Sequence, residues 1–279
     1  MTVGRPVNNS HTAKVEAQWL RLHALPPSAF AACMPAAFDV SWHWRAWRAQ
    51  ARWLATQQRV EQWLLSLDLN AAGVGAQAQG PALILLGGSA GWMMSDAFLA
   101  QFRRILLIDL DPWAGILFKW NHRTALSSGR THLTFHRGDV HAQLTDLLAW
   151  DPQAVVLFDN FLGLDSMYTG NLKATEERLK ALQHRLRGRV WGSLHDRISG
   201  PGTRHWAQAE AWNLSPQLLA REPLPEAALL ASVQGQGEWL DHGTEHVLPP
   251  STPTRLIPWP IVPGRWHWLQ AGWVMPGLG

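Results

Sequence analysis

The chain has 279 residues, of which 47% are hydrophobic and 16% are charged. This composition excludes a mainly disordered chain and predicts one large core of about 200 residues with an N-terminal appendage. The formal net charge of +3 is too small to indicate a nucleic-acid-binding protein without a local basic patch. The single cysteine, Cys33, excludes an intramolecular disulfide and a cysteine-based zinc site.

The beginning of the chain resembles neither a signal peptide nor a membrane anchor. Residues 1–13 are polar, and no apolar run in the chain reaches about 18 residues. Together with the cysteine content, this predicts a soluble cytoplasmic protein that does not bind membranes. Most of the 18 tryptophans are expected to pack in the core or to brace the N-terminal helices.

The N-terminal third has a helical pattern. Between residues 41 and 67, apolar side chains recur at spacings near 3.6, with arginines between them and with Ser41 as the expected cap. Residues 68–80 are expected to form a flexible connection. We therefore predict an N-terminal helical cap over residues 1–78, placed over a neighbouring pocket, followed by a core domain over residues 79–279.

After Gly80 the pattern alternates between strands and helices. Continuous apolar strands separated by helices indicate a mostly parallel sheet with helices on both faces, which is a Rossmann-like α/β fold. Two final strands separated by Pro263-Gly264 predict an antiparallel C-terminal hairpin. The expected strands are 82–86, 105–109, 132–136, 154–159, 189–195, 255–262 and 266–274, and the expected helices are 92–102, 112–124, 143–149 and 175–187.

A glycine-rich turn follows the first of these strands. The run Pro81-Ala-Leu-Ile-Leu-Leu-Gly-Gly-Ser-Ala-Gly91 indicates a buried strand that delivers a ligand to the start of a helix. The next strand ends at Asp109, about 20 residues after the turn, where a carboxylate can accept hydrogen bonds from a ribose. These features predict a site for a cofactor that contains a nucleoside.

Polar residues follow two further strands. Gly138-Asp139-Val140 comes after the third strand, and Asp159-Asn160 comes after the fourth. Because ligands in open α/β sheets bind outside the carboxyl ends of the strands, these residues are expected to line one crevice with the glycine turn and Asp109.

The order of these motifs resembles the class I S-adenosylmethionine-dependent methyltransferases over roughly residues 81–195. Ser89 stands where that family usually has glycine, and Leu85 or Leu86 stands where it often has an acid. The resemblance implies S-adenosylmethionine as the cofactor, with Asp109 at the ribose, Asp139 and Val140 at the adenine, and Asp159 and Asn160 at the methionyl end and the substrate. It also places the glycine turn and the residue after Asp109 at the cofactor, namely Gly87, Gly88, Ser89, Gly91 and Leu110.

Methyl transfer from a sulfonium requires mainly that the acceptor be positioned and that water be removed. Tyr168 follows Asn160, and His195 ends the next strand, so both are candidates for the acceptor pocket and for a base if one is needed. A structural role remains open for each of them. The apolar, tryptophan-rich composition favours a small-molecule or peptide acceptor over duplex nucleic acid.

Other functions compete with this interpretation. Gly87-Gly-Ser-Ala-Gly91 also matches the nucleophile elbow of α/β hydrolases, with Ser89 as nucleophile and His242 or His246 as its base. His242-Gly-Thr-Glu-His246 matches an inverted zinc-protease pattern, although its glycine and the prolines that follow indicate a loop. A nicotinamide-binding fold would require a third glycine where Trp92 stands. A catalytically silent binding module and an aminopropyltransferase are further alternatives.

Overall fold

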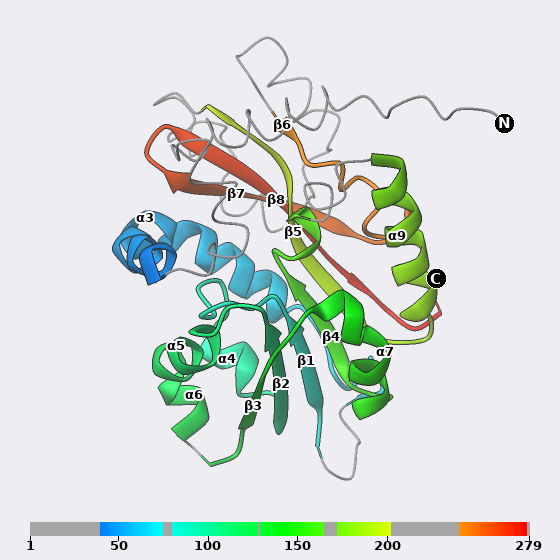
Figure 1. Cartoon of the computed structure of the whole chain (residues 1–279). Helices are drawn as coiled ribbons and strands as arrows, with labels where there is room; N and C mark the ends of the chain where they lie inside the picture. Colours follow the sequence, from blue (N-terminus) through cyan, green and yellow to red (C-terminus); the bar gives the residue numbers. More distant parts are fainter. Residues whose placement is uncertain (1–39, 75–79, 128, 165–171, 202–239, 278–279) are drawn as a thin grey trace, which may run out of the picture.

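The computed structural model describes residues 40–74, 80–127, 129–164, 172–201 and 240–277, which form one sheet flanked by helices (Figure 1). The strands follow the order β3-β2-β1-β4-β5-β8-β7, and the short β6 pairs with β5. Their bounds are β1 Ala82–Leu86, β2 Arg104–Asp109, β3 His132–Arg137, β4 Val155–Asp159, β5 Trp191–Pro201, β6 Leu240–Asp241, β7 Thr254–Val262 and β8 Arg265–Val274.

Strand direction confirms the predicted fold class. Strands β1 to β5 pair in parallel, β8 runs antiparallel to β5, and β7 runs antiparallel to β8. The reversed strand β8 therefore lies between β5 and β7, in a sheet that is otherwise parallel apart from the short β6. This is the expected Rossmann-like sheet with an antiparallel C-terminal hairpin.

Helices cover both faces of the sheet, and each face has its own apolar core. The side chains of β1 alternate, so that Leu83 and Leu85 belong to one core whereas Ile84 and Leu86 belong to the other. In Figure 1 the helices α3, α4, α5 and α6 lie on one side of the sheet, and α7 and α9 lie on the other. Their bounds are α3 Val40–Leu64, α4 Asp96–Leu99, α5 Ala114–Asn121, α6 Arg123–Ser127, α7 Val140–Trp150 and α9 Leu172–Arg185.

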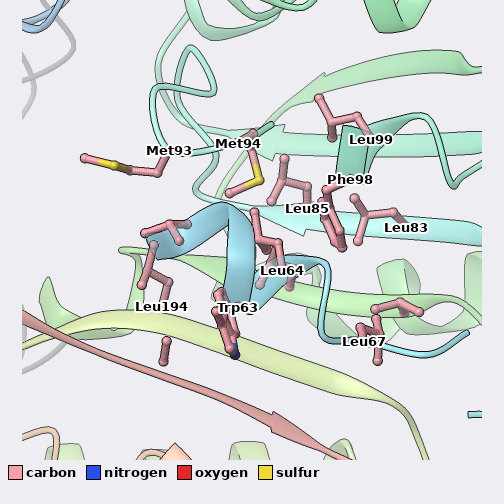
Figure 2. Close-up of a cluster of buried hydrophobic side chains, with 14 of the residues drawn as sticks. Trp63, Leu64, Leu67, Leu83, Leu85, Met93, Met94, Phe98, Leu99 and Leu194 are labelled. Carbon is pink, nitrogen blue, oxygen red and sulfur yellow. The ribbon is translucent and has the colours of Figure 1, made fainter. Parts of the chain in front are cut away.

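Helix α3 is a layer of the core. Its Trp63 ring stacks on Trp273 of β8, with ring centroids 4.9 Å apart, and its Trp53 ring meets the Trp259 ring of β7 edge-on at 5.2 Å. Figure 2 shows Trp63 and the neighbouring Leu64 among apolar side chains of the sheet and of α4. The helical segment expected in the N-terminal third therefore packs on the sheet itself, and the proposed boundary at residues 78 and 79 stays a prediction.

The predicted helix over residues 92–102 is wrong. Only α4 forms there, with four residues, and Ser95 caps it by accepting a 3.2 Å hydrogen bond from the Phe98 N–H. The preceding loop holds Ser89 at φ 46° and Gly91 at φ 72°, which are left-handed conformations outside the α-helical region. The glycine turn consequently does not lead directly into a helix N-terminus, as its sequence suggested.

Several other boundaries also differ from those expected. Ser41 does not cap α3, because the helix already includes Val40. The expected helix over residues 112–124 is divided into α5 and α6 at His122, whose ring contacts Asp96 and the Gly91 carbonyl. Strand β5 continues past His195 to Pro201. Among the described helices, none is both long enough and apolar enough to cross a membrane.

Candidate functional site

The register of the parallel strands brings the predicted site residues to one edge of the sheet. Leu86, the last residue of β1, pairs with Ile108 on one side and with Phe158 on the other. The residues that follow these three, Gly87, Asp109 and Asp159, therefore lie at the same carboxyl edge. The segment after β3 joins them there, because Asp109 pairs with the last residue of that strand.

Asp109 holds the glycine loop in place. Its carboxylate is buried, with Oδ2 accepting the Ser89 N–H at 2.8 Å and Oδ1 accepting the Asp111 N–H at 2.9 Å. Burial raises the pKa of Asp109, and the two backbone hydrogen bonds oppose that rise. Each carboxylate oxygen can accept more than one hydrogen bond, so these contacts are compatible with the predicted role in ribose binding.

The glycines of the loop are required by the protein's own packing. A Cβ on Gly87, whose φ is 74°, would lie 2.8 Å from the Cβ of Phe161, and a Cβ on Gly88 would lie 2.8 Å from Leu85 Cδ2. A Cβ on Gly91, at φ 72°, would collide with the His122 ring. The sequence pattern indicates glycines that let a ligand approach closely, but the structure shows that the loop also needs them for its own packing.

Asp159 and Asn160 form a buried pair of acceptors at the end of β4. Burial, and secondarily the charge of Asp109, raise the pKa of Asp159 to about 8. Within the described part of the chain, the Asn160 side-chain Oδ1 is buried and accepts no hydrogen bond. The Asn160 backbone has φ 50°, and its N–H donates to the Leu194 carbonyl at 2.7 Å. A carboxyl group with a raised pKa, followed in the chain by an amide oxygen that accepts no hydrogen bond from the described residues, is suited to a cationic group that donates hydrogen bonds.

A contact that the sequence did not predict ties α3 to this edge. His43 Nε2 lies 2.5 Å from Asp111 Oδ2, and both side chains are buried. The Trp92 indole N–H donates to His43 Nδ1 at 3.4 Å, which places the imidazole proton on Nε2, because indole can only donate. Asp111 Oδ1 accepts the Trp113 N–H at 2.9 Å. Asp111 thus joins α3 to the start of α5. The sequence feature that could have indicated this contact is a histidine, His43, on the buried face of an amphipathic helix.

Hydrogen exchange should report this link between α3 and the site. We expect S-adenosylhomocysteine to slow amide exchange around His43 several-fold, because a ligand that orders the loop after β2 also stabilises the contact with Asp111. Exchange followed by mass spectrometry checks this. In His43→Ala the protection should remain at Gly87–Gly91 but disappear from the first turns of α3. Unchanged exchange around His43 in the unmodified protein, with protection at the glycine loop, would show that α3 only supports the sheet.

The remaining residues predicted to bind the cofactor follow β2 and β3 at the same edge as Asp109. Asp139 is exposed and caps α7, with Oδ1 accepting the His141 N–H at 2.8 Å. Val140 is the buried first residue of that helix, and Leu110 is partly exposed after β2. The capping role explains why an aspartate stands at position 139. The adenine contacts of Asp139 and Val140 and the cofactor contact of Leu110 stay predictions.

The two candidates for the acceptor pocket have different outcomes. His195 is fully buried, where its Nε2–H donates to Gln270 Oε1 at 3.0 Å and its Nδ1 accepts from the Ser193 hydroxyl at 2.9 Å. Burial lowers the pKa of His195 to about 4. With both nitrogens engaged, this ring is better suited to positioning than to proton removal. Tyr168 lies outside the described residues, and the roles of both stay predictions.

The hydrolase alternative lacks its catalytic partners in this geometry. In the described chain no histidine hydrogen-bonds to Ser89, and the helix that follows the loop has only four residues. We expect a fluorophosphonate probe to leave Ser89 unlabelled, because no base among the described residues is placed to activate its hydroxyl. Intact-protein mass spectrometry checks this. A stoichiometric adduct that disappears in Ser89→Ala would instead establish a serine hydrolase.

Known proteins resemble this chain only distantly. No family model matches the sequence, and no curated protein matches it. Among solved structures, the chain is similar to an O-methyltransferase family protein from Burkholderia thailandensis, with 15% identity, 96% of this chain and 71% of that chain covered, and a TM-score of 0.41. It is also similar to an S-adenosylmethionine-dependent methyltransferase from Thiobacillus denitrificans solved with S-adenosyl-L-homocysteine. The two share 13% identity, the match covers 77% of this chain and 91% of that chain, and the TM-score is 0.35. The fold assignment rests on the strand order and register described above.

Proposed function

We propose that this protein is an S-adenosylmethionine-dependent methyltransferase that acts on a small-molecule or peptide acceptor and not on duplex nucleic acid. The observation that carries the proposal is the pair of buried carboxyl groups, Asp109 and Asp159, at strand ends on either side of the Gly87 turn. S-adenosylmethionine has ribose hydroxyls for one carboxylate and a sulfonium and an ammonium group for the other.

The electrostatics of the edge favour this cofactor over a nucleotide with a pyrophosphate. The charge of Asp109, which is close enough to raise the pKa of Asp159, would repel phosphate oxygens, and a phosphate at this edge would further oppose ionisation of Asp159. A cation beside Asp159 would instead stabilise its ionised form. The buried Asn160 Oδ1 supplies a second acceptor for the same cation. The residues present therefore fit the cofactor that the fold implies.

When bound, S-adenosylmethionine would supply a methyl group already activated for displacement. The protein's part is then to bind, orient and exclude water. Asp109 would fix the ribose while holding the loop at Ser89, and Asp159 with Asn160 would hold the cationic end. Phe161, which is half-buried next to this pair with its ring 4.8 Å from that of His141, would shield the site from water.

The activity is tested by supplying cofactor labelled in its methyl group with separate pools of small metabolites, peptides and duplex nucleic acid. We expect labelled product in the first or second pool, and its loss in Asp159→Asn. Asp146→Asn, which changes an exposed aspartate on α7, serves as the matched control and should retain activity. Stoichiometric cofactor binding with no transfer to any pool would favour a silent binding module, and transfer only to duplex nucleic acid would contradict the acceptor class.

The acceptor side of the site should be separable from the cofactor side. We expect Tyr168→Phe and His195→Ala to lower methyl transfer about tenfold while changing the affinity for S-adenosylhomocysteine less than twofold, since both act on the acceptor. Steady-state kinetics and calorimetry check this once an acceptor is found, and the thermal midpoint identifies variants that fail to fold. A variant that turns over at the wild-type rate would show that its residue is not part of the acceptor pocket. A variant that binds S-adenosylhomocysteine more weakly would show that its residue contacts the cofactor instead.

A further inference from the structure

Three buried side chains from separate segments meet on the sheet beyond the candidate cofactor site. They are Asp196 of β5, His242 just after β6 and His267 of β8, and each is at most 4% exposed. Among the described residues, one potential ligand atom from each of the three lies within 4.8 Å of the other two. His267 Nδ1 is 2.9 Å from Asp196 Oδ1, and the two imidazole centroids are 5.9 Å apart. We propose that Asp196, His242 and His267 bind a divalent transition-metal ion of the zinc class.

The backbone holds these side chains firmly. The pairing of β5 with β8 changes register between Asp196 and Ile198, and bulges of this kind commonly redirect a side chain at a functional site. The His242 N–H donates to the Arg197 carbonyl at 3.1 Å, and the Thr244 hydroxyl donates to the Asp196 carbonyl at 2.8 Å. The site is therefore built on paired strands and fixed backbone contacts, which gives it the rigidity that metal coordination requires.

The ring orientation of His242 is typical of a metal ligand. Its Nε2 lies 2.9 Å from the Ser199 hydroxyl, so we assign Nδ1 to the metal. A histidine bound to a metal usually has its second nitrogen held by an oxygen in this way, which fixes the tautomer and the ring plane. Ser199 would accordingly orient His242 without binding the ion.

The donor set selects the class of ion. Two imidazoles and one carboxylate suit zinc or a similar first-row ion with a fourth position left for water, whereas calcium and magnesium prefer oxygen ligands alone. The nearby Arg197 is also buried, and its guanidinium Nη2 lies 3.9 Å from the exposed carboxylate of Glu245.

The three proposed ligands differ from those of the inverted zinc-protease pattern, His242-Gly-Thr-Glu-His246, that the sequence contains. The inverted protease motif would pair His242 with His246 on one helical face, but residues 242–252 are not helical and His246 is exposed. The fold instead pairs His242 with two residues that are distant in the sequence. His246 consequently serves as a matched control, because it is an exposed histidine of the same loop and is not part of the buried cluster.

The position of the cluster suggests what the ion would do. A Cβ on Gly163, in the turn after β4, would lie 2.9 Å from the Asp196 N and 3.5 Å from Asn160 Oδ1. The proposed ligand Asp196 therefore packs directly against the segment that carries Asn160. A bound ion would fix β5 and β8 behind this segment. The metal site does not depend on the proposed methyltransferase activity.

Titration of untagged, metal-free protein with Co²⁺ tests the proposal, because four-coordinate Co²⁺ with nitrogen and oxygen ligands gives a visible absorption band. We expect one equivalent to bind, Zn²⁺ to displace it, and Zn²⁺ to raise the thermal midpoint. His242→Ala, His267→Ala and Asp196→Asn should each weaken Co²⁺ binding at least a hundredfold, whereas His246→Ala should bind as the wild type does.

Two results would overturn the assignment. The first is wild-type protein that binds no stoichiometric Co²⁺ or Zn²⁺ at submillimolar concentration, a measurement that requires no variant to fold. The second is a loss of binding in His246→Ala as large as that in His242→Ala, which would place the ion on the loop motif instead. Circular dichroism of each variant separates lost ligation from lost structure.

Discussion

Replacing Asp109 with alanine should weaken the binding of S-adenosylhomocysteine about a hundredfold or more. The carboxylate is expected to accept hydrogen bonds from the ribose, and charged hydrogen bonds of this kind contribute about 1.5 to 3 kcal/mol each. It also accepts the backbone N–H groups of Ser89 and Asp111, which would lose their partner. The substitution therefore removes a ligand contact and loosens the loop at the same time.

Calorimetry on the wild type, Asp109→Ala and Asp109→Asn checks this result. The asparagine variant retains one acceptor oxygen and should lose less affinity than the alanine variant. Asp146→Ala, on the exposed surface of α7, should bind normally. Suppose instead that Asp109→Ala bound S-adenosylhomocysteine with an affinity within about threefold of that of the wild type, while its thermal midpoint fell. Asp109 would then be a structural residue of the loop and not a cofactor ligand.

The affinity for S-adenosylmethionine should rise with pH between about 6 and 8. The pKa of Asp159 is raised to about 8, so the carboxyl group is mainly protonated at neutral pH in the free protein. A cation beside it favours the ionised form, so binding releases a proton. Each pH unit below the pKa then costs up to about tenfold in affinity, or ~1.4 kcal/mol, and the affinity levels off above about pH 8.

Two comparisons isolate the contribution of Asp159. Asp159→Asn should flatten the pH profile and should reduce binding of S-adenosylmethionine more than that of S-adenosylhomocysteine, because only the first carries a sulfonium. Proton release can be measured directly by calorimetry in buffers of different ionisation enthalpy. A wild-type affinity that does not change between pH 6 and 8 would show that no cation lies beside this carboxyl group.

The sequence was sufficient to predict the sheet and the positions of its acidic residues. The apolar run at residues 82–86 is wholly buried, as a central parallel strand requires, and Asp109 and Asp159 end the two strands that flank it, as the pattern predicts. These predictions succeeded because strand burial and parallel register follow from local patterns. Once the strands are placed in order, their carboxyl ends must meet.

Features that depend on tertiary contacts could not be predicted in this way. Residues 92–102 have a helix-like apolar pattern, but the helix begins only at Asp96. The loop before it has left-handed backbone at Ser89 and Gly91, and the Gly91 carbonyl contacts the His122 ring. The contact of His43 with Asp111 joins residues 68 positions apart. The cluster around His242 likewise gathers three segments that no spacing rule connects.

Calorimetric titration of the unmodified protein with S-adenosylmethionine and S-adenosylhomocysteine tests the central claim most directly. The arrangement of Asp109, Asp159 and Asn160 around the glycine loop predicts one site per chain for each, with dissociation constants in roughly the micromolar range. The absence of heat and of any shift in the thermal midpoint at millimolar concentrations of either compound would contradict it.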